Sequence, residues 1–207
     1  MGVFKLKKGY DIPLQGSAER RVEKAPKTTA VAVQPIDFRG LRPAMKVEAG
    51  DKVSRGSILF VDKQKPEILF RSPAAGTVRE VVRGERRVIQ RVIIDVAGDT
   101  AEKFDSYTAD QVNAFSTSQA KELLLNSGLW PAIRQRPFSK IADVEASPKA
   151  IIISAVDSAP LQAESDILLD GQEKTFQLGI QLLSKLTEGK IPLSVSEKTK
   201  AFFSNIS

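Results

Sequence analysis

The first half of the chain alternates short apolar runs with turn residues, which is the pattern of a β-rich domain. Runs rich in Val, Ile and Phe, bounded by Gly, Pro or Asp, recur from Thr28 to about Val96. They predict strands at Val31–Val33, Ile58–Val61, Ile68–Phe70, Thr77–Val82 and Val88–Val96. In the last run Val92, Ile94 and Val96 fall on one face, which is the alternation of a strand buried on one side.

From Phe104 onward the apolar positions take a helical period. Ser116 followed by Gln119 predicts a capping box at the start of a helix that stops near Gly128. Apolar residues at three- to four-residue spacing predict a second helix at Gln172–Leu186.

Two short strands flank the second helix. Lys149–Ser154 is expected to be a fully apolar strand of the kind found inside parallel sheets, and Ile191–Val195 a second strand. Ser196 is expected to cap a further helix. Strand, crossover helix and strand form a βαβ unit and hence a parallel, Rossmann-like sheet. Because two strands do not complete such a sheet, we expect this α/β domain to be incomplete in the sequence.

Two residue types are missing, and their absence narrows the chemistry. Among 207 residues there is no cysteine and no histidine. Without cysteine the chain offers no thiolate for a disulfide, an iron–sulfur cluster or a zinc finger. Without histidine it lacks the usual general base near neutral pH and the commonest transition-metal ligand. We therefore expect no catalytic residue and no metal site, and redox chemistry only through a group bound to the chain or beside it.

Composition and charge bound the partners. Apolar residues make up 42% and charged residues 27%, as in an ordinary folded protein, and no apolar run approaches the ~20 residues that span a bilayer. We expect a cytoplasmic or peripheral protein that contacts the membrane only through a partner. The formal net charge is +6, but the few aromatic residues are not interleaved with the basic ones, so nucleic acid is not the expected partner. Docking on a protein or on anionic headgroups fits better.

A glycine-rich motif defines the first domain. Val47–Leu59 contains Gly-Asp-x-Val-x-x-Gly followed by an apolar pair, and Ser72–Val78 supplies a second turn with Pro73 and Gly76. Together they resemble the repeats of biotinyl and lipoyl carrier domains, which implies a barrel-sandwich hybrid fold. Val53 is then expected to point into the barrel.

A carried cofactor is nevertheless not expected. Lys65 lies where carrier domains place their modified lysine, but Pro66 follows it, and the flanking residues do not form the tip that modifying ligases read. We interpret Lys65 as a solvated lysine on a hairpin tip, so no cofactor is covalently bound.

A series of strings along the chain carries a wider resemblance. The strings are Lys7–Leu14, Gly40–Val47, Arg83–Gln90, Ser127–Arg134, Arg136–Lys140 and Ala155–Leu161. In order and spacing the series is similar to the A-type subunit family of the sodium-translocating NADH:quinone reductase. Related electron-transport subunits share the Ser127–Lys140 region but add flavin or nucleotide loops and Cys-x-x-Cys motifs, which this chain lacks.

This resemblance implies a mixed α and β architecture and a place in a redox pump. We expect an N-terminal extension over residues 1–27, a barrel-sandwich hybrid domain over 28–100 and an α/β domain over 104–207. The family role implies a peripheral subunit on the cytoplasmic side of the bacterial inner membrane. NADH and flavins would be held by partner subunits, which pass electrons to a quinone while sodium is exported.

The resemblance also places the chain at the quinone end, next to the membrane subunit that reduces quinone. Binding of a quinone needs apolar or aromatic walls and a cationic donor for its oxyanion forms. The residues expected near the headgroup or the docking face are Phe38, Leu41, Arg42, Arg134, Arg136, Pro137, Phe138 and Lys140. A second set, expected to dock on acidic partner loops or lipid headgroups, is Arg83, Arg86, Arg87 and Arg91.

Structural alternatives stand beside both sets. Arg136–Lys140 could be an inter-domain segment in which Phe138 fills a core and the arginines pair with Asp143 or Glu145. The four arginines could form a solvated hairpin, and Asp157 is interpreted as structural. The chain as a whole could be a scaffold that binds no ligand.

Overall fold

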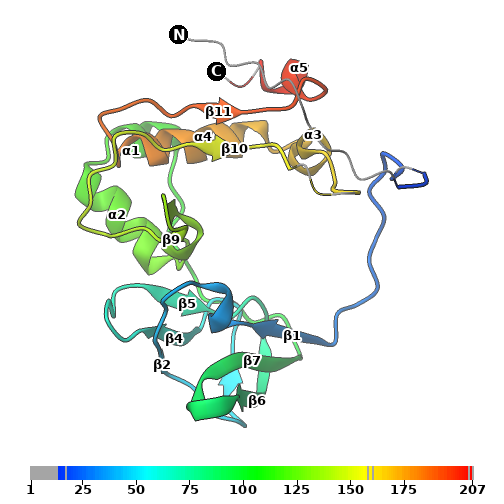
Figure 1. Cartoon of the computed structure of the whole chain (residues 1–207), viewed down its shortest axis with the longest axis vertical. Coiled ribbons are helices and arrows are strands. Elements are labelled where there is room, and N and C mark those ends of the chain that lie inside the picture. The colour runs from blue at the N-terminus through cyan, green and yellow to red at the C-terminus, as the bar shows by residue number, and fades with distance from the viewer. Residues whose placement is uncertain (1–13, 17, 158, 160, 205, 207) are drawn as a thin grey trace.

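The first half of the chain forms two antiparallel sheets (Figure 1). The computed structural model of the 207-residue chain describes residues 14–16, 18–157, 159, 161–204 and 206. The four-stranded sheet has the order β1-β7-β6-β3, with bounds β1 Ala30–Val33, β7 Ile89–Val96, β6 Gly76–Arg83 and β3 Lys52–Val53. The three-stranded sheet has the order β2-β4-β5, with bounds β2 Pro43–Met45, β4 Ile58–Asp62 and β5 Leu69–Arg71. Short 3-10 turns lie at η1 Pro35–Asp37 and η2 Glu85–Arg87.

The five strands predicted in this half are confirmed to within one residue, and the carrier-like motif folds as expected. Val53 is buried in the core, and Gly50 and Gly56 turn the chain with φ of 96° and 97°. Gly76 has φ of 155°, and a Cβ there would lie 1.8 Å from the carbonyl oxygen of Asp95, so only glycine fits between β6 and β7. The two-residue β3 and the three-residue β2, which begins with proline, carry too few apolar residues to be predicted from the pattern.

The second half is mainly helical, with short strands. Its elements are α1 Ala109–Asn113, α2 Thr117–Asn126, η3 Trp130–Ala132, β8 Arg134–Gln135, β9 Lys140–Ile141, β10 Ile153–Ser154, α3 Ser165–Leu169, α4 Glu173–Ser184, β11 Leu193–Ser194 and α5 Lys200–Phe203. The predicted capping box of Ser116 and Gln119 is present in both directions. The predicted β10–α4–β11 unit is confirmed, since β10 and β11 pair in parallel.

One expectation about this unit is wrong. Lys149–Ser154 is not a fully buried strand: only Ile153–Ser154 is assigned to β10, a single bridge joins Ala150 to Lys190, and Ile152 is 71% exposed. In the described part of the chain β10 has β11 as its one partner strand, so its apolar side chains are not covered on both faces. The further helix is present as α5, but its N-cap is Thr199 and not Ser196, whose hydroxyl lies 2.9 Å from that of Thr199.

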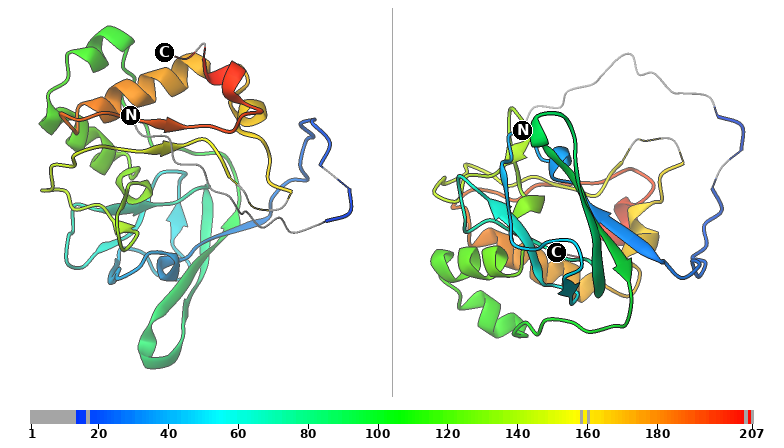
Figure 2. Two further views of the ribbon diagram at one scale, coloured as in Figure 1. Left: turned by 45° about the horizontal axis from the view of Figure 1, so that its top comes forward. Right: turned by 90° about the horizontal axis from the view of Figure 1, so that it is seen from below.

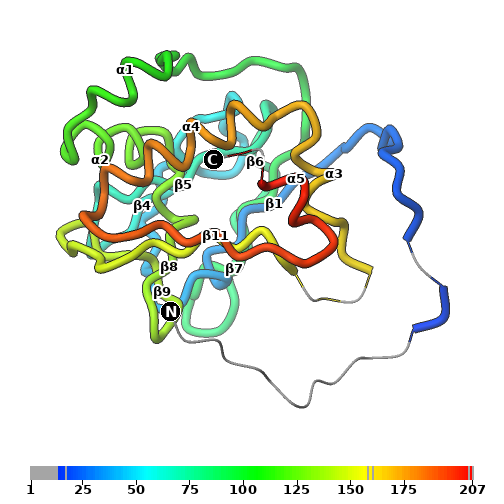
Figure 3. Tube along the Cα trace, turned by 90° about the horizontal axis from the view of Figure 1, so that it is seen from above, coloured from blue at the N-terminus to red at the C-terminus, as the bar shows by residue number. Residues whose placement is uncertain are grey.

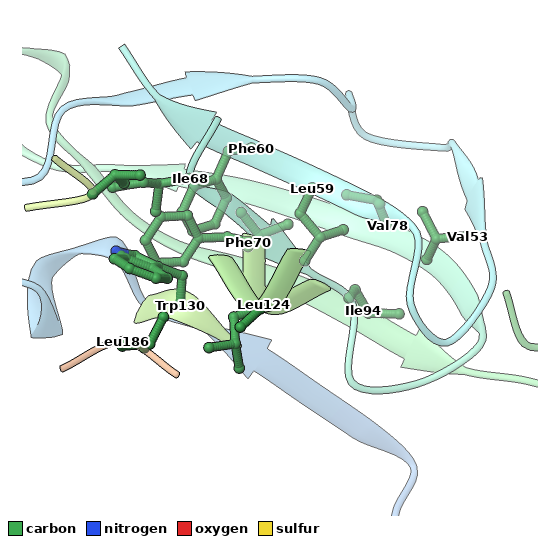
Figure 4. Packing of buried hydrophobic residues seen from close by; sticks show 13 residues of the cluster. Val53, Leu59, Phe60, Ile68, Phe70, Val78, Ile94, Leu124, Trp130 and Leu186 are labelled. Atoms are coloured by element: carbon green, nitrogen blue, oxygen red, sulfur yellow. The ribbon is translucent and has the colours of Figure 1, made fainter. Parts of the chain in front are cut away.

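Buried side chains from both halves form one cluster (Figure 4). Phe60, Leu59 and Ile94 of the sheets are fully buried, and Leu124 of α2 and Trp130 of η3 pack into the same cluster. The β sheets and the following helices therefore share a core, which fixes the position of the segments that leave it.

The N-terminal segment runs along the outside of the molecule toward the helical half (Figure 3). Arg20 forms ion pairs with Glu164 and Asp166 at the start of α3. Of the string Lys7–Leu14 only Leu14 belongs to the described residues.

Candidate functional site

The candidate site is built on a small hairpin that hangs from Trp130. The indole Nε1 of Trp130 donates a hydrogen bond of 2.9 Å to the carbonyl of Ala142, and the Ala142 N–H donates to the carbonyl of Ile133. These bonds close the base of the β8–β9 hairpin, in which Arg134 pairs with Ile141. Because Trp130 is only 3% exposed, the hairpin is anchored in the core while its tip lies in solvent.

An aromatic series leads from the core to this hairpin. Phe60 stacks on Phe70 with a centroid distance of 4.6 Å, and Phe70 meets Phe38 edge to face at 4.9 Å. Phe38 follows η1 and is half-buried. One side of Phe38 is therefore held by the core, and the rest of the ring faces the hairpin.

Two arginine–phenylalanine pairs join the segments reciprocally. The guanidinium carbon of Arg134 lies 4.8 Å from the ring centroid of Phe38, and that of Arg39 lies 5.9 Å from the ring centroid of Phe138. Arg39 also donates a weak hydrogen bond of 3.5 Å to the carbonyl of Phe138. Each cation–π pair is worth roughly 0.5–1 kcal/mol at an exposed position. We call these four residues the Phe38–Phe138 surface.

The structure thus brings three of the predicted quinone-proximal residues, Phe38, Arg134 and Phe138, into one surface. Arg39 was missed by sequence reasoning; its one signal was its position directly after Phe38. Arg134 also donates to the carbonyl of Ser139, which lies in the hairpin turn with φ of 52°.

The other predicted residues lie around this surface without entering it. Leu41 is half-buried and packs on the core cluster. Pro137 is exposed in the hairpin turn and follows a cis peptide bond. Arg42, Arg136 and Lys140 are exposed, and none of them belongs to an ion pair given for the described residues.

The structural alternative for this segment is wrong in both parts. Phe138 does not fill a core, since it is 61% exposed. Asp143 pairs with Lys65 at 2.7 Å and not with an arginine of the hairpin. The expectation that Lys65 is simply solvated is also wrong: Lys65 is 35% exposed and is held by this carboxylate.

The Lys65–Asp143 pair ties the β4–β5 turn to the base of the hairpin. The hydrogen bond from Lys65, helped by the backbone N–H of Glu145, holds the pKa of the Asp143 carboxyl below its ordinary value of 3.8. The backbone N–H of Asp143 donates to the side-chain oxygen of Gln135 in β8. The lysine expected at a solvated tip therefore helps to position the candidate site.

The predicted docking arginines lie elsewhere. Arg83, Arg86, Arg87 and Arg91 are all exposed at the far end of the β6–β7 hairpin. Asp157 accepts a hydrogen bond from the backbone N–H of Ala159, which is consistent with a structural role in a turn.

The described residues offer little for other kinds of site. No group of three or more His, Cys, Asp or Glu side chains there could hold a metal ion. No helix of that part is long and apolar enough to cross a membrane. A shallow hollow at one end of the four-stranded sheet is lined by Lys52, Ser54, Thr77 and Thr100 among others, and includes no residue of the predicted sites.

Comparison with known proteins assigns both halves of the chain. The family described as the NqrA N-terminal barrel-sandwich hybrid domain matches residues 4–97, and the NqrA second alpha/beta domain matches residues 115–207. The chain belongs to the NqrA family. The fold class expected from the sequence, a barrel-sandwich hybrid followed by an α/β domain, is thereby confirmed.

Individual relatives agree with this assignment. The NqrA protein of Pseudomonas aeruginosa, a component of the Na(+)-translocating NADH-quinone reductase, is 42% identical over 184 residues, which cover 89% of this chain and 41% of the relative. Its counterpart in a Marinomonas species is 40% identical over 198 residues, which cover 96% of this chain and 44% of the relative. The chain therefore spans less than half the length of these NqrA relatives.

Proposed function

We propose that this chain is part of a peripheral, cytoplasmic-side component of a sodium-translocating NADH:quinone reductase, and that it contributes to the quinone end of that complex without a redox centre of its own. Membership of the NqrA family supports the complex. The observation that carries the quinone role is the Phe38–Phe138 surface, which combines two accessible aromatic rings with two guanidinium groups.

The chemistry of this surface suits a quinone headgroup. A quinone is a flat ring with two carbonyl oxygens, and reduction places negative charge on those oxygens. Phe38 and Phe138 offer rings on which such a plane stacks, and Arg39 and Arg134 offer donors that strengthen as the charge develops. Arg42, Arg136 and Lys140 add positive charge around the same segments. No residue of the chain has to move a proton or an electron for this role.

The division of labour within the complex follows from this proposal. NADH and flavins belong to partner subunits, and the face that carries the β8–β9 hairpin docks on the quinone-reducing membrane subunit. The three-part organisation, with an extension over residues 1–27, a barrel over 28–100 and an α/β domain over 104–207, is part of the same proposal.

Trp130 provides the test. It is the only tryptophan, and its indole is bonded to the base of the hairpin, so a quinone bound at the tip would quench its emission. The chain is titrated with a short-tailed ubiquinone analogue, as wild type and as Phe138→Ala and Arg134→Ala. We expect saturable quenching in the wild type and about tenfold weaker binding in each variant, because each loses one of a few oriented contacts worth roughly 1–2 kcal/mol.

The matched control is Val88→Ala, which trims an apolar residue that is also exposed, at 55%, on a different hairpin. Its titration should equal that of the wild type. Linear, collisional quenching that is the same in all four proteins would contradict a quinone site on this surface. That result would favour the alternative function, a scaffold in which the two arginine–phenylalanine pairs only hold the segments together.

A further inference from the structure

The β6–β7 hairpin carries an unusual concentration of unpaired positive charge at its tip. The two strands project away from the body of the molecule (Figure 2). Between Arg83 and Arg91 the sequence holds four arginines and one acidic residue, Glu85. All four arginines are exposed, and no ion pair given for the described residues includes any of them. We call Arg83, Arg86, Arg87 and Arg91 the tip arginines.

The base of the same hairpin is treated differently. Arg79 of β6 is paired across the strands with Asp95 of β7, and this contact lowers the pKa of the Asp95 carboxyl and raises that of the Arg79 guanidinium. The charge is thus neutralised near the body and left free at the far end.

The backbone of the tip shows that the turn itself does not favour these residues. Arg86 has φ of 53° and ψ of 26°, and Arg87 has φ of 60°. The Val88 N–H donates to the carbonyl of Glu85 and closes the turn, as in a type I′ turn. Such turns prefer Asn-Gly, because left-handed backbone is unfavourable for residues with a long side chain. Strained residues of this kind persist where their side chains have a use.

An apolar side chain lies among the charges. Val88 directly follows Arg87 and is 55% exposed. A protruding loop that combines arginines with one exposed aliphatic group has the composition of a segment that lies at the headgroup level of a membrane.

We propose that the tip arginines bind anionic phospholipid headgroups directly. Guanidinium groups form paired hydrogen bonds to phosphate, and a convex tip reaches a flat layer of phosphates without needing a matching groove. The inference rests on the proposed place of the chain in a membrane-bound complex. It adds a direct lipid contact to the expectation that membrane contact comes only through partner subunits.

The test is co-sedimentation of the chain with vesicles of phosphatidylcholine, with and without phosphatidylglycerol. We expect binding only to the vesicles that contain phosphatidylglycerol, and loss of that binding as salt is raised. Each basic residue near such a surface contributes roughly fivefold. The quadruple variant with each tip arginine changed to Gln should therefore bind at least about a hundredfold more weakly.

A matched control carries the same change of net charge elsewhere. Lys103, Lys149, Lys174 and Lys190 are exposed, and their quadruple change to Gln should leave most of the binding intact. A second variant, Arg86→Asn with Arg87→Gly, should raise the thermal midpoint of unfolding because the turn is relieved, while it weakens vesicle binding.

Three results would overturn the proposal. The wild type does not bind vesicles that contain phosphatidylglycerol, or both quadruple variants lose binding equally, or the chain binds a poly-glutamate peptide through the tip arginines but no vesicle. The last result would assign the tip to an acidic protein segment. None of these results affects the quinone titration, since the two surfaces share no residue.

Discussion

At the scale of single residues, Arg71 connects the two halves of the molecule. Its Nε donates to the carbonyl of Asn126 at the end of α2, and its Nη1 donates to the carbonyl of Gly56 in the barrel. The guanidinium also lies 5.2 Å from the ring centroid of Phe104. Burial lowers the pKa of Arg71, an effect opposed by Glu102, but an arginine remains protonated in proteins. One side chain thus satisfies carbonyls from two segments far apart in sequence.

Arg71→Lys is therefore not a conservative change. A lysine ammonium cannot donate to both carbonyls in the same planar geometry, so we expect a loss of about 1–2 kcal/mol in the free energy of unfolding. Urea denaturation followed by Trp130 fluorescence measures this loss. Arg55→Lys, at an exposed position of the same domain, is the control and should change little. Equal effects of the two substitutions would show that Arg71 does not hold the halves together.

At the scale of elements, the β8–β9 hairpin depends on a polar pair at its base. Lys65 reaches Asp143 from the β4–β5 turn, and the side chain of Gln135 accepts from the Asp143 N–H. The carboxyl has its pKa lowered by its contact with Lys65, so the pair stabilises the folded state fully above the ordinary value of 3.8. This contribution is lost as the pH falls from there through the lowered pKa.

Asp143→Asn tests this pH dependence. The wild type should exceed the variant in unfolding free energy by no more than about 1 kcal/mol between roughly pH 5 and 7, because the pair is half-exposed. The difference should shrink below about pH 4, where the carboxylate takes up a proton. Parallel urea titrations at several pH values measure it, with Asp99→Asn, an exposed aspartate, as the control. A difference that stays constant down to the lowest pH would contradict the lowered pKa.

At the scale of the whole molecule, periodicity predicted the long elements and resemblance predicted the fold class. Strand alternation located β6 and β7, and the capping box located α2, because those signals are local. The pairing of Arg39 with Phe138 joins residues 99 positions apart, and no local pattern contains it. The role of Lys65 was missed for the same reason, since its partner Asp143 lies in the other half of the chain.

The resemblance did identify the segments of the candidate site before their contacts were visible. It named Phe38, Arg134 and Phe138, which the fold brings together, along with Arg136 and Lys140, which lie exposed beside them. The exposure of Phe138 could not be read from the sequence, because a phenylalanine between proline and serine fits a core as well as a surface. The shared core of Leu124, Trp130 and the sheet residues then explains why the site has a fixed place in the molecule.

Hydrogen exchange in the presence of a short-tailed quinone tests the central claim most directly, because it locates any ligand along the whole chain. We predict slower amide exchange in peptides that cover Phe38–Arg42 and Ile133–Ala142, and unchanged exchange in the β6–β7 hairpin. In Phe138→Ala the protection of both segments should fall together, since the two arginine–phenylalanine pairs join them. Protection confined to other segments, or none at saturating quinone, would show that the Phe38–Phe138 surface is not a quinone site.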